Sequence, residues 1–303
     1  MTLPHRATPR DASPDTVRRN SARTLSFDGN PYTLMPPTPI TSKSNARVKS
    51  LRASFSGNAS LPGDVLGIEG EHLIAEAIRS GYTLETLFLR EGSESILTRP
   101  SLSTLDPRIT LLLSRDVFAS AVETASPQGI AAIILLHAPA PPTPQPQSTL
   151  LVLEGLQDPG NLGTLIRSAE AFGAQQIFVT PDTVNQWNPK VVRASAGSVF
   201  RIPILRAPLQ QIAERLVQQG TTLYAAVAQS PNPTSLLDVH FAPHTALMIG
   251  NEGAGLSAAA LALAHHCIRI PCAVESLNAA VAGSTLLYEA LRQRAQHPTE
   301  ATP

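Results

Sequence analysis

Residues 158–174 read DPGNLGTLIRSAEAFGA, and this stretch predicts a complete helix with both of its ends. Asp158 or Asn161 can accept hydrogen bonds from the unpaired amides of the first turn. Pro159 suits a first-turn position that donates no hydrogen bond, and Gly173 suits the left-handed residue that follows a helix. A strand-like apolar run, TLLVLEGL at 149–156, comes directly before. The stretch therefore predicts a strand that leads into a helix over 159–172.

The same stretch contains one arginine, Arg167, inside its apolar pattern. One interpretation is a solvated side chain paired with Glu170, three residues further on, which contributes little to stability. The other interpretation is a functional cation on the helix surface. The helix alone does not decide between them, so the remainder of the chain has to.

Strand and helix patterns alternate on both sides of this stretch. After it, strands are expected at 176–180, 199–206, 222–228, 245–250 and 267–271, and helices at 189–195, 208–219, 257–266 and about 276–296. Short apolar strands separated by helices indicate an α/β domain with a mainly parallel sheet covered on both faces. In such sheets, ligands bind beyond the carboxyl ends of the strands.

The chain divides into five parts by composition and pattern. Residues 1–40 and 298–303 lack apolar periodicity and are expected to be disordered tails. Residues 41–138 alternate helix and strand patterns, including a helical one at 95–105, and predict a smaller α/β domain. The proline-rich residues 139–148 are a linker. Residues 149–297 form the second α/β domain.

Composition excludes several classes of protein. The longest apolar run, at 129–138, is too short for the roughly 20 residues of a membrane-spanning helix. No secretion signal or transit peptide is expected at the start. The two cysteines, Cys267 and Cys272, lack the spacing of a zinc site and favour the reducing cytoplasm. We therefore expect neither a metal, a disulfide framework nor a membrane partner.

Charge is balanced over the whole chain, with 23 basic and 23 acidic residues, so net charge indicates no nucleic-acid partner. Two stretches are locally basic, however. One lies between Asp28 and Asp64; the other lies between Asp182 and Glu214 and contains Lys190, Arg193, Arg201 and Arg206. Solvated surface and contact with phosphates are equally good readings of charge alone.

Two loops after expected strands hold unusual polar residues. IGNEGAGLS at 249–257 has the glycines of a tight turn or of close backbone approach to a ligand. It fits a phosphate loop poorly, because the glycine order differs, no lysine follows and Glu252 repels phosphate. Further on, Ser276 is expected to cap the terminal helix with Asn278 just inside, where asparagine favours capping or ligand binding.

Taken together, NLGTLIR (161–167), IGNEGAGL (249–256) and IPCAVESLNAAVA (270–282) resemble the three motifs of the SpoU (TrmH-like) RNA ribose 2′-O-methyltransferases. Their order and spacing match. Upstream, SNARVKSLR (44–52) and GIEGEHLIAEAIRSG (67–81) are similar to the L30e-like substrate-binding domain that precedes the catalytic domain in many of these enzymes. The resemblance covers all but about the first forty residues.

The resemblance implies S-adenosylmethionine as cofactor, RNA as substrate, a homodimer, and a deep trefoil knot in the second domain. It places the adenosyl part of the cofactor against Gly250, Ile270 and Leu277. The knot is a rare exception to the rule that protein chains do not thread loops.

The resemblance also implies a catalytic set of Arg167, Asn161, Glu252 and Asn278. Methyl transfer to a ribose hydroxyl requires positioning of two reactants and stabilisation of the developing alkoxide. Because a guanidinium stays protonated near neutrality, we favour an electrostatic role for Arg167, with literal proton abstraction left open. Two departures from the family pattern, Cys272 and Ala280, remove a methionine and a serine hydroxyl from the third motif.

RNA contacts are implied on both domains. The expected residues are Lys43, Arg47, Lys49 and Arg52 in the first, and Lys190, Arg193 and Ser195 in the second. The expected activity is S-adenosylmethionine-dependent 2′-O-methylation of 23S ribosomal RNA, because the L30e-like domain is commoner in the rRNA-modifying branch. Three alternatives stay open: a non-catalytic RNA-binding or ribosome-assembly factor, a tRNA-directed methyltransferase, and an antibiotic-resistance rRNA methyltransferase. No DNA partner is expected.

Overall fold

The computed structural model describes residues 38–102, 105, 107–138 and 140–296. The described chain contains a four-stranded sheet and a seven-stranded sheet, so the expected α/β class with a mainly parallel sheet is confirmed. Most of both expected tails lies outside the described residues. Residues 38–40 of the first tail are described, and Ile40 pairs with Leu113.

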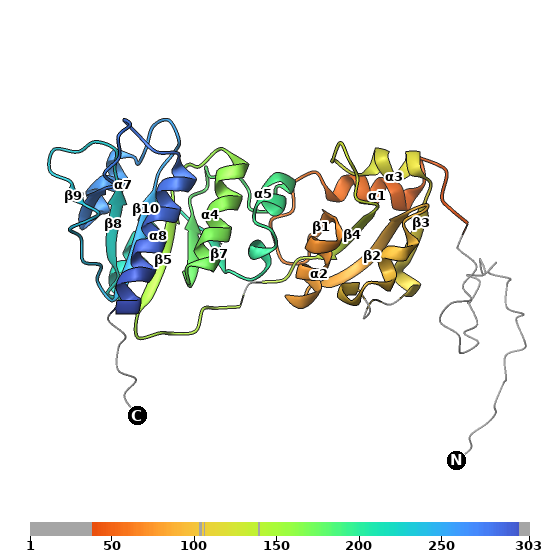
Figure 1. The fold of residues 1–303 in the computed structure, drawn as a ribbon, viewed down its shortest axis with the longest axis horizontal. Coiled ribbons are helices and arrows are strands. Elements are labelled where there is room, and N and C mark those ends of the chain that lie inside the picture. The colour runs from red at the N-terminus through yellow and green to blue at the C-terminus, as the bar shows by residue number, and fades with distance from the viewer. Residues whose placement is uncertain (1–37, 103–104, 106, 139, 297–303) are drawn as a thin grey trace, which may run out of the picture. The chain divides into compact units, whose positions relative to one another are not determined.

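The first sheet has the strand order β1-β4-β2-β3 (Figure 1). Its strands are β1 (Val65–Glu69), β2 (Thr83–Arg90), β3 (Thr110–Leu113) and β4 (Ile130–Leu135). Helices α1 (Ala46–Ser54) and α3 (Arg115–Ala121) pack on one face, and α2 (Glu71–Arg79) packs on the other. Side chains alternate between the faces of a strand, so Phe88 joins the α1 and α3 side while Leu87 and Leu89 join the α2 side.

The helix expected at 95–105 is wrong. The described residues there form two 3-10 turns, η1 (Glu94–Thr98) and η2 (Pro100–Leu102), followed by η3 (Pro107–Ile109). Pro100 donates no backbone hydrogen bond and disfavours helical geometry in the residue before it, so the first turn ends at Arg99 in an extended conformation.

The second sheet has the order β7-β6-β5-β10-β8-β11-β9, and every recorded pairing in it is parallel. Its strands are β5 (Ser148–Leu153), β6 (Gln176–Val179), β7 (Ile204–Arg206), β8 (Thr222–Ala226), β9 (Thr234–Ser235), β10 (His244–Ile249) and β11 (His266–Arg269). The chain runs from β5 outward to β7 and then crosses back to the other side of β5. This reversal of strand order is where a parallel sheet opens a ligand crevice at its carboxyl edge.

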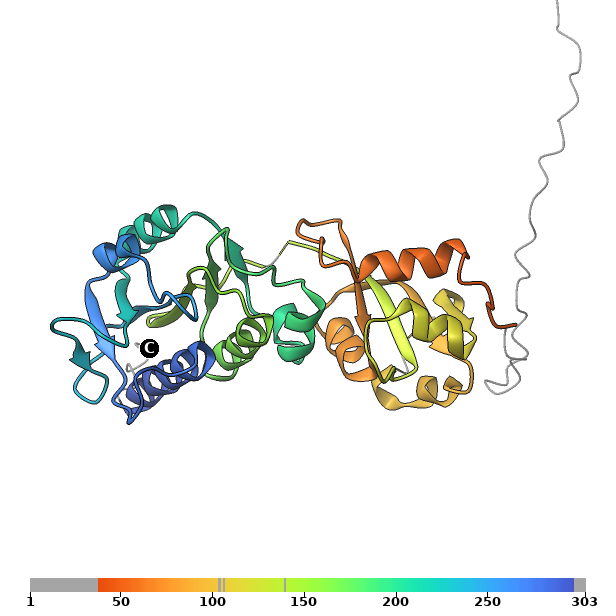
Figure 2. The ribbon, with the colours of Figure 1, turned by 90° about the horizontal axis from the view of Figure 1, so that it is seen from above.

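Helices cover both faces of the second sheet. Helices α4 (Pro159–Ala171) and α8 (Ala279–Gln296) pack against Leu151, Leu153 and Ile249 on one face. Helices α6 (Leu209–Gln218) and α7 (Ala258–Leu263) pack against Leu150 and Val152 on the other. Figure 2 shows these two layers on opposite sides of the strands. The short helix α5 (Pro189–Ala194) packs against α4.

Two local expectations need correction. The strand expected at 199–206 is only three residues long, because Gly197 takes a left-handed conformation (φ 92°) and Ser198–Phe200 forms a 3-10 turn, η4. The terminal helix begins at Ala279 rather than near Ser276. Its cap is Asn278, whose Oδ1 accepts hydrogen bonds from the amides of Ala280 and Val281. Within the described residues, no helix has both the length and the apolar character needed to cross a membrane.

Candidate active site

The loop between β5 and α4 forms the first wall of the site. Asp158 caps α4, because its Oδ1 accepts a hydrogen bond from the Asn161 amide at 2.7 Å. Of the two caps that the sequence allowed, the structure uses Asp158. The Asn161 side chain is thereby free to reach away from its own helix toward the neighbouring loops.

Glu252, in the loop after β10, lies against this helix start. Its carboxylate accepts hydrogen bonds from the amide of Gln157 at 3.2 Å, the amide of Asp158 at 3.1 Å and Nδ2 of Asn161 at 3.0 Å. Partial burial raises the pKa of the Glu252 carboxyl, but the hydrogen bonds from Asn161 and from backbone amides outweigh it, so the pKa lies below its usual value. Glu252 is therefore an anion at neutral pH that holds two loops together.

Asn278 brings in the third loop. Its Nδ2 donates to Oδ1 of Asn161 at 2.9 Å, while its own Oδ1 caps α8. Both ends of the Asn161 amide are thus used, since its oxygen accepts from Asn278 and its nitrogen donates to Glu252. The three segments NLGTLIR, IGNEGAGL and IPCAVESLNAAVA meet in one hydrogen-bonded junction, and we call Asn161, Glu252 and Asn278 the loop junction.

A cavity of about 560 Å³ opens beside the loop junction, at the carboxyl edge of the sheet. Gly250, Ile270 and Leu277 all line it, together with Glu252, Glu275 and Cys272. Its walls combine apolar side chains with backbone groups of the glycine-rich loop. A cavity of this size with a few convergent polar groups is typical of a small-molecule site.

Gly250 is required by the loop itself. A Cβ added there would come within 2.2 Å of the backbone carbon of Gly255, because Asn251 and Gly255 exchange two backbone hydrogen bonds across the turn. By contrast, a Cβ added at Gly253 would meet only Oδ1 of Asn251, at 3.6 Å. The close backbone approach expected from the sequence is therefore an approach of the loop to itself.

Arg167 lies outside the cavity, on the exposed surface of α4. Among the described residues, no side chain or carbonyl forms a hydrogen bond or ion pair with it. The pair with Glu170 that its spacing allowed does not form, because Glu170 binds Arg201 instead, at 2.9 Å between Oε2 and Nη2. Arg167 is held on a rigid helix with its charge unused.

The residues expected to contact RNA are mostly exposed. Lys43 precedes α1, Arg47 and Lys49 project from it, and the nearby Arg52 donates from Nε to the Ser120 carbonyl at 3.1 Å. Lys190 is exposed on α5, and Arg193 is half-buried there.

Ser195 differs from the other expected RNA contacts. Its side chain is buried, and its hydroxyl donates to the Val192 carbonyl at 2.9 Å. Within this chain it completes the end of α5 and does not present its hydroxyl at the surface.

The second basic stretch is less basic at the surface than its sequence indicates. Arg201 pairs with Glu76 and Glu170, which are distant in sequence. Arg206 donates to the carbonyls of Thr180, Pro181, Thr183 and Val184 and so fastens the loop after β6. Counting charges along the chain misses partners that folding supplies, so only Lys190 and Arg193 keep free cations in this stretch among the described residues.

Sequence reasoning missed two residues that shape the site. Gln157 donates from Nε2 to the Asp182 carbonyl, tying the first loop to the loop after β6. Asn251 donates from Nδ2 to the Gly155 carbonyl at 2.8 Å and accepts from the amides of Gly253 and Ala254. An asparagine before glycines is a known turn signal, so Asn251 was detectable, whereas the partner of Gln157 was not.

The two departures in the third motif have local consequences. Cys272 lines the cavity, and its Sγ lies 3.1 Å from the Val274 carbonyl. Ala280 is buried in the first turn of α8. One turn further on, the hydroxyls of Ser284 and Ser168 are hydrogen bonded at 2.7 Å and join α8 to α4.

The chain is similar to known proteins in both of its parts. Residues 148–288 match the model of the SpoU rRNA Methylase family, and residues 68–139 match that of the RNA 2′-O ribose methyltransferase substrate-binding domain. An uncharacterized tRNA/rRNA methyltransferase of Synechocystis is 36% identical over 84% of this chain and 94% of its own length. The chain belongs to the SpoU rRNA methylase family. As a member of this family it is a methyltransferase.

Two further proteins are similar to this SpoU chain over most of their length. The 23S rRNA (guanosine(2553)-2′-O)-methyltransferase RlmP of Bacillus subtilis is 32% identical over 82% of this chain and 97% of its own. The crystal structure of an AdoMet-bound rRNA methyltransferase from Sinorhizobium meliloti superposes with a TM-score of 0.72, at 28% identity, over 86% of this chain and 98% of the other. The likeness extends over both sheets.

Proposed function

We propose that this SpoU protein transfers the methyl group of S-adenosylmethionine to the 2′-hydroxyl of a ribose in 23S ribosomal RNA. The observation that carries the proposal is the loop junction, in which Glu252, Asn161 and Asn278 join three distant segments beside one cavity. The similarity to RlmP, whose name specifies 23S rRNA, supports this substrate.

The lining of the cavity suits the cofactor in surface chemistry and in charge. Apolar side chains, including Ile270 and Leu277, offer a surface for the adenine ring, and the backbone of the loop after Gly250 offers hydrogen-bonding groups. Glu252 and Glu275 line the same cavity and favour a cationic ligand. When bound, S-adenosylmethionine supplies an electrophilic methyl group on a sulfonium.

The residues of this chain divide the remaining work. The loop junction fixes the loops that would hold the cofactor and would thereby restrict how it is oriented. Arg167 has no partner among the described residues and binds the ribose oxygen. This oxygen becomes negatively charged as the hydroxyl loses its proton to water. Since a guanidinium keeps its own protons near neutrality, it stabilises the oxyanion rather than removing the proton.

RNA reaches Arg167 along cations that are exposed or half-buried. Lys190 and Arg193 on α5 lie next to α4 in the packing of the domain, and Lys43, Arg47, Lys49 and Arg52 offer phosphate contacts on the first domain. The buried Ser195 supports α5 and acts through it. The two cysteines, Cys267 and Cys272, are free, which is typical of proteins in the reducing cytoplasm and agrees with a ribosomal RNA substrate there.

A homodimer completes the proposal. On α8, the apolar side chains of Val281, Tyr288 and Leu291 are 51%, 55% and 39% exposed, and Tyr288 meets Phe172 of α4 at 5.7 Å between ring centroids. A second copy packed on this face of α4 and α8 would cover them and bring Arg167 to the interface. We also propose that the segment after β11 is threaded as a trefoil knot, which its return to Asn161 through Asn278 supports.

Transfer of labelled methyl groups from S-adenosylmethionine tests the function. The purified chain is incubated with unmodified transcripts of 23S rRNA, 16S rRNA and tRNA, and the labelled nucleotide is mapped. We expect label on one ribose of 23S rRNA. Tight RNA binding without cofactor uptake would replace the proposal with a non-catalytic RNA-binding factor, and label on tRNA alone would replace its substrate.

A further inference from the structure

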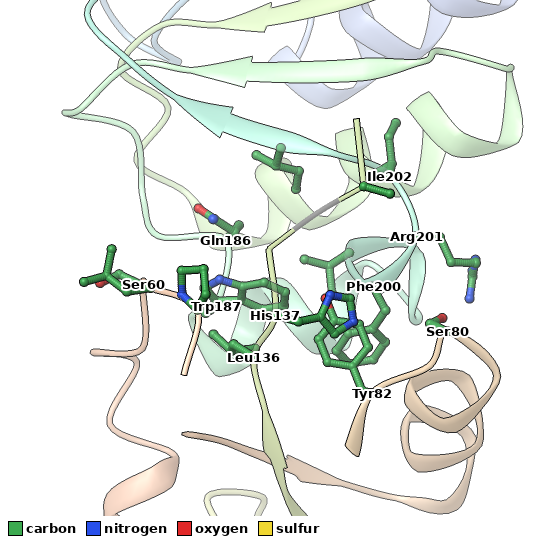
Figure 3. A pocket seen from close by; sticks show the side chains of 15 residues that line it. Ser60, Ser80, Tyr82, Leu136, His137, Gln186, Trp187, Phe200, Arg201 and Ile202 are labelled. Carbon is green, nitrogen blue, oxygen red and sulfur yellow. The ribbon is translucent and has the colours of Figure 1, made fainter. Parts of the chain in front are cut away.

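A second cavity, of about 360 Å³, shares no lining residue with the cofactor cavity. Figure 3 shows its lining. Tyr82 and His137 come from the segments that follow α2 and β4, whereas Gln186, Trp187 and Phe200 come from the segments on either side of α5. Neither the family motifs nor the mechanism above uses this cavity.

Four aromatic rings form part of the wall of this cavity. The ring centroid of Tyr82 lies 4.1 Å from that of His137 and 5.2 Å from that of Phe200, and Trp187 stacks with Phe200 at 6.3 Å. Tyr82, Trp187 and Phe200 are buried, while His137 is exposed at the opening. Flat rings that bound a cavity of this size favour a flat, aromatic ligand.

The charge of the wall disfavours an anionic ligand. Arg201 lines the cavity, but two carboxylates, those of Glu76 and Glu170, neutralise it. The side chains of Ser60, Ser80 and Gln186 add no charge to the wall. A phosphate or carboxylate would therefore enter without a free cation to meet it, which makes burial unfavourable.

Two hydrogen-bond donors of the wall are unused. Among the described residues, neither the hydroxyl of Tyr82 nor the indole N–H of Trp187 has a hydrogen-bond partner. Burial raises the pKa of Tyr82 to about 12, so its hydroxyl keeps its proton at neutral pH. Gln186 lines the same cavity and supplies an amide. A ligand with ring acceptors and an amide edge satisfies these groups.

We propose that this cavity binds one unpaired nucleobase of the substrate RNA. Nucleobases are flat, neutral and edged with acceptors and donors, and proteins that read RNA insert unstacked bases against aromatic side chains. The proposal rests on the proposed function, because it assumes an RNA substrate. It adds a specificity site that lies apart from the reacting ribose.

Trp187 is the single tryptophan of the chain, so its fluorescence reports on this cavity alone. The full chain is titrated with the unmodified 23S rRNA transcript, and separately with free adenosine, guanosine, cytidine and uridine. Methyl transfer is measured in the same RNA samples. We expect the transcript to quench Trp187 emission over the concentration range in which it binds.

Variants test whether the quench arises in the cavity. His137→Ala removes an exposed ring from the opening and should weaken transcript binding about tenfold, which is the usual value of one stacked base. Tyr82→Phe removes an unpaired hydroxyl and keeps the ring, so it should reduce the quench without unfolding the chain. Val217→Ala, on α6, shortens an exposed side chain elsewhere and should change neither.

The outcomes separate this proposal from the proposed function. If the transcript is methylated while Trp187 emission stays constant, the nucleobase site is wrong and the methyltransferase assignment stands. If free nucleosides quench Trp187 and the transcript does not, the cavity serves a free metabolite and the proposal is overturned. Quenching by the transcript that His137→Ala weakens establishes the site, whether or not methyl transfer is detected.

Discussion

Asn161 and Arg167 lie on the same helix, α4, yet their surroundings differ completely. Asn161 uses both ends of its amide, toward Glu252 and Asn278, beside the proposed cofactor cavity. Arg167 is exposed and has no partner among the described residues. The contrast teaches that one end of α4 is tied into the loop junction within this chain, whereas Arg167 presents an unpaired charge, which in our proposal RNA and a second subunit complete.

Arg167→Ala is expected to lower turnover more than any other variant described here. Loss of a group that stabilises an oxyanion lowers turnover about 100- to 1,000-fold. Single-turnover methyl transfer to the 23S rRNA transcript measures it. The matched control is Arg215→Ala, an exposed arginine on α6 at the other face of the sheet, which should leave turnover near wild type. Wild-type turnover in Arg167→Ala would remove this residue from the mechanism.

Asn161→Ala is expected to loosen the loop junction and to lower turnover. It leaves the Asn278 amide and the Glu252 carboxylate without their shared partner. A cost of about 1–3 kcal/mol in positioning corresponds to a roughly five- to 150-fold loss of turnover. Asn161→Asp, of equal size, should be no better, because it places a second carboxylate beside Glu252. Initial rates at saturating RNA measure the effect. Unchanged rates in both variants would mean that the junction does not position the cofactor loops.

Two glycines of one loop sharpen the comparison on the side of the loop junction. Gly250→Ala places a Cβ against the Gly255 backbone and should lower the unfolding free energy by about 1–3 kcal/mol, with weaker cofactor binding. Gly253→Ala meets only ordinary contact and should change stability by less than about 0.5 kcal/mol. Chemical denaturation and calorimetry measure both. Equal effects at the two positions would contradict the observed turn.

The pH dependence of Glu252 gives the smallest expected effect. Its pKa in the folded chain lies below the usual value, so its stabilising contribution is full above the unfolded pKa of about 4.3 and is lost as pH falls through the lower folded pKa. The Tm difference between wild type and Glu252→Gln should therefore shrink as pH falls from 7 toward and below 4. A difference that grows on acidification would show that the carboxylate is strained in the folded state.

Local signals predicted much of the fold but little of its contacts. Pro159 and Gly173 marked α4 because caps depend on neighbouring residues, and apolar periodicity marked most strands of the second sheet. Pro100 ends the first turn of the expected helix, and Gly197 shortens the expected strand. Short segments lose their propensity to a single proline or left-handed residue.

The sequence predicted which residues form the loop junction but not which hydrogen bonds join them. The motifs identified Asn161, Glu252 and Asn278, but periodicity carries no information on which amide donates to which oxygen. Ion pairs between residues distant in sequence also determine which cations stay unpaired, since Arg201 pairs with Glu76, more than a hundred residues away. Helix α8 begins later than expected, because Asn278 and not Ser276 caps it. The Asn278 side chain binds Asn161 through its nitrogen and caps α8 through its oxygen.

Cofactor affinity of Arg167→Ala tests the central claim most directly. Calorimetry with S-adenosylmethionine alone compares this variant with wild type and with Asn161→Ala, without RNA present. If the cofactor site is complete without the arginine, Arg167→Ala binds the cofactor with the wild-type Kd while Asn161→Ala binds it more weakly. Cofactor binding lost in Arg167→Ala and kept in Asn161→Ala would contradict the division of the site between the loop junction and the exposed face of α4.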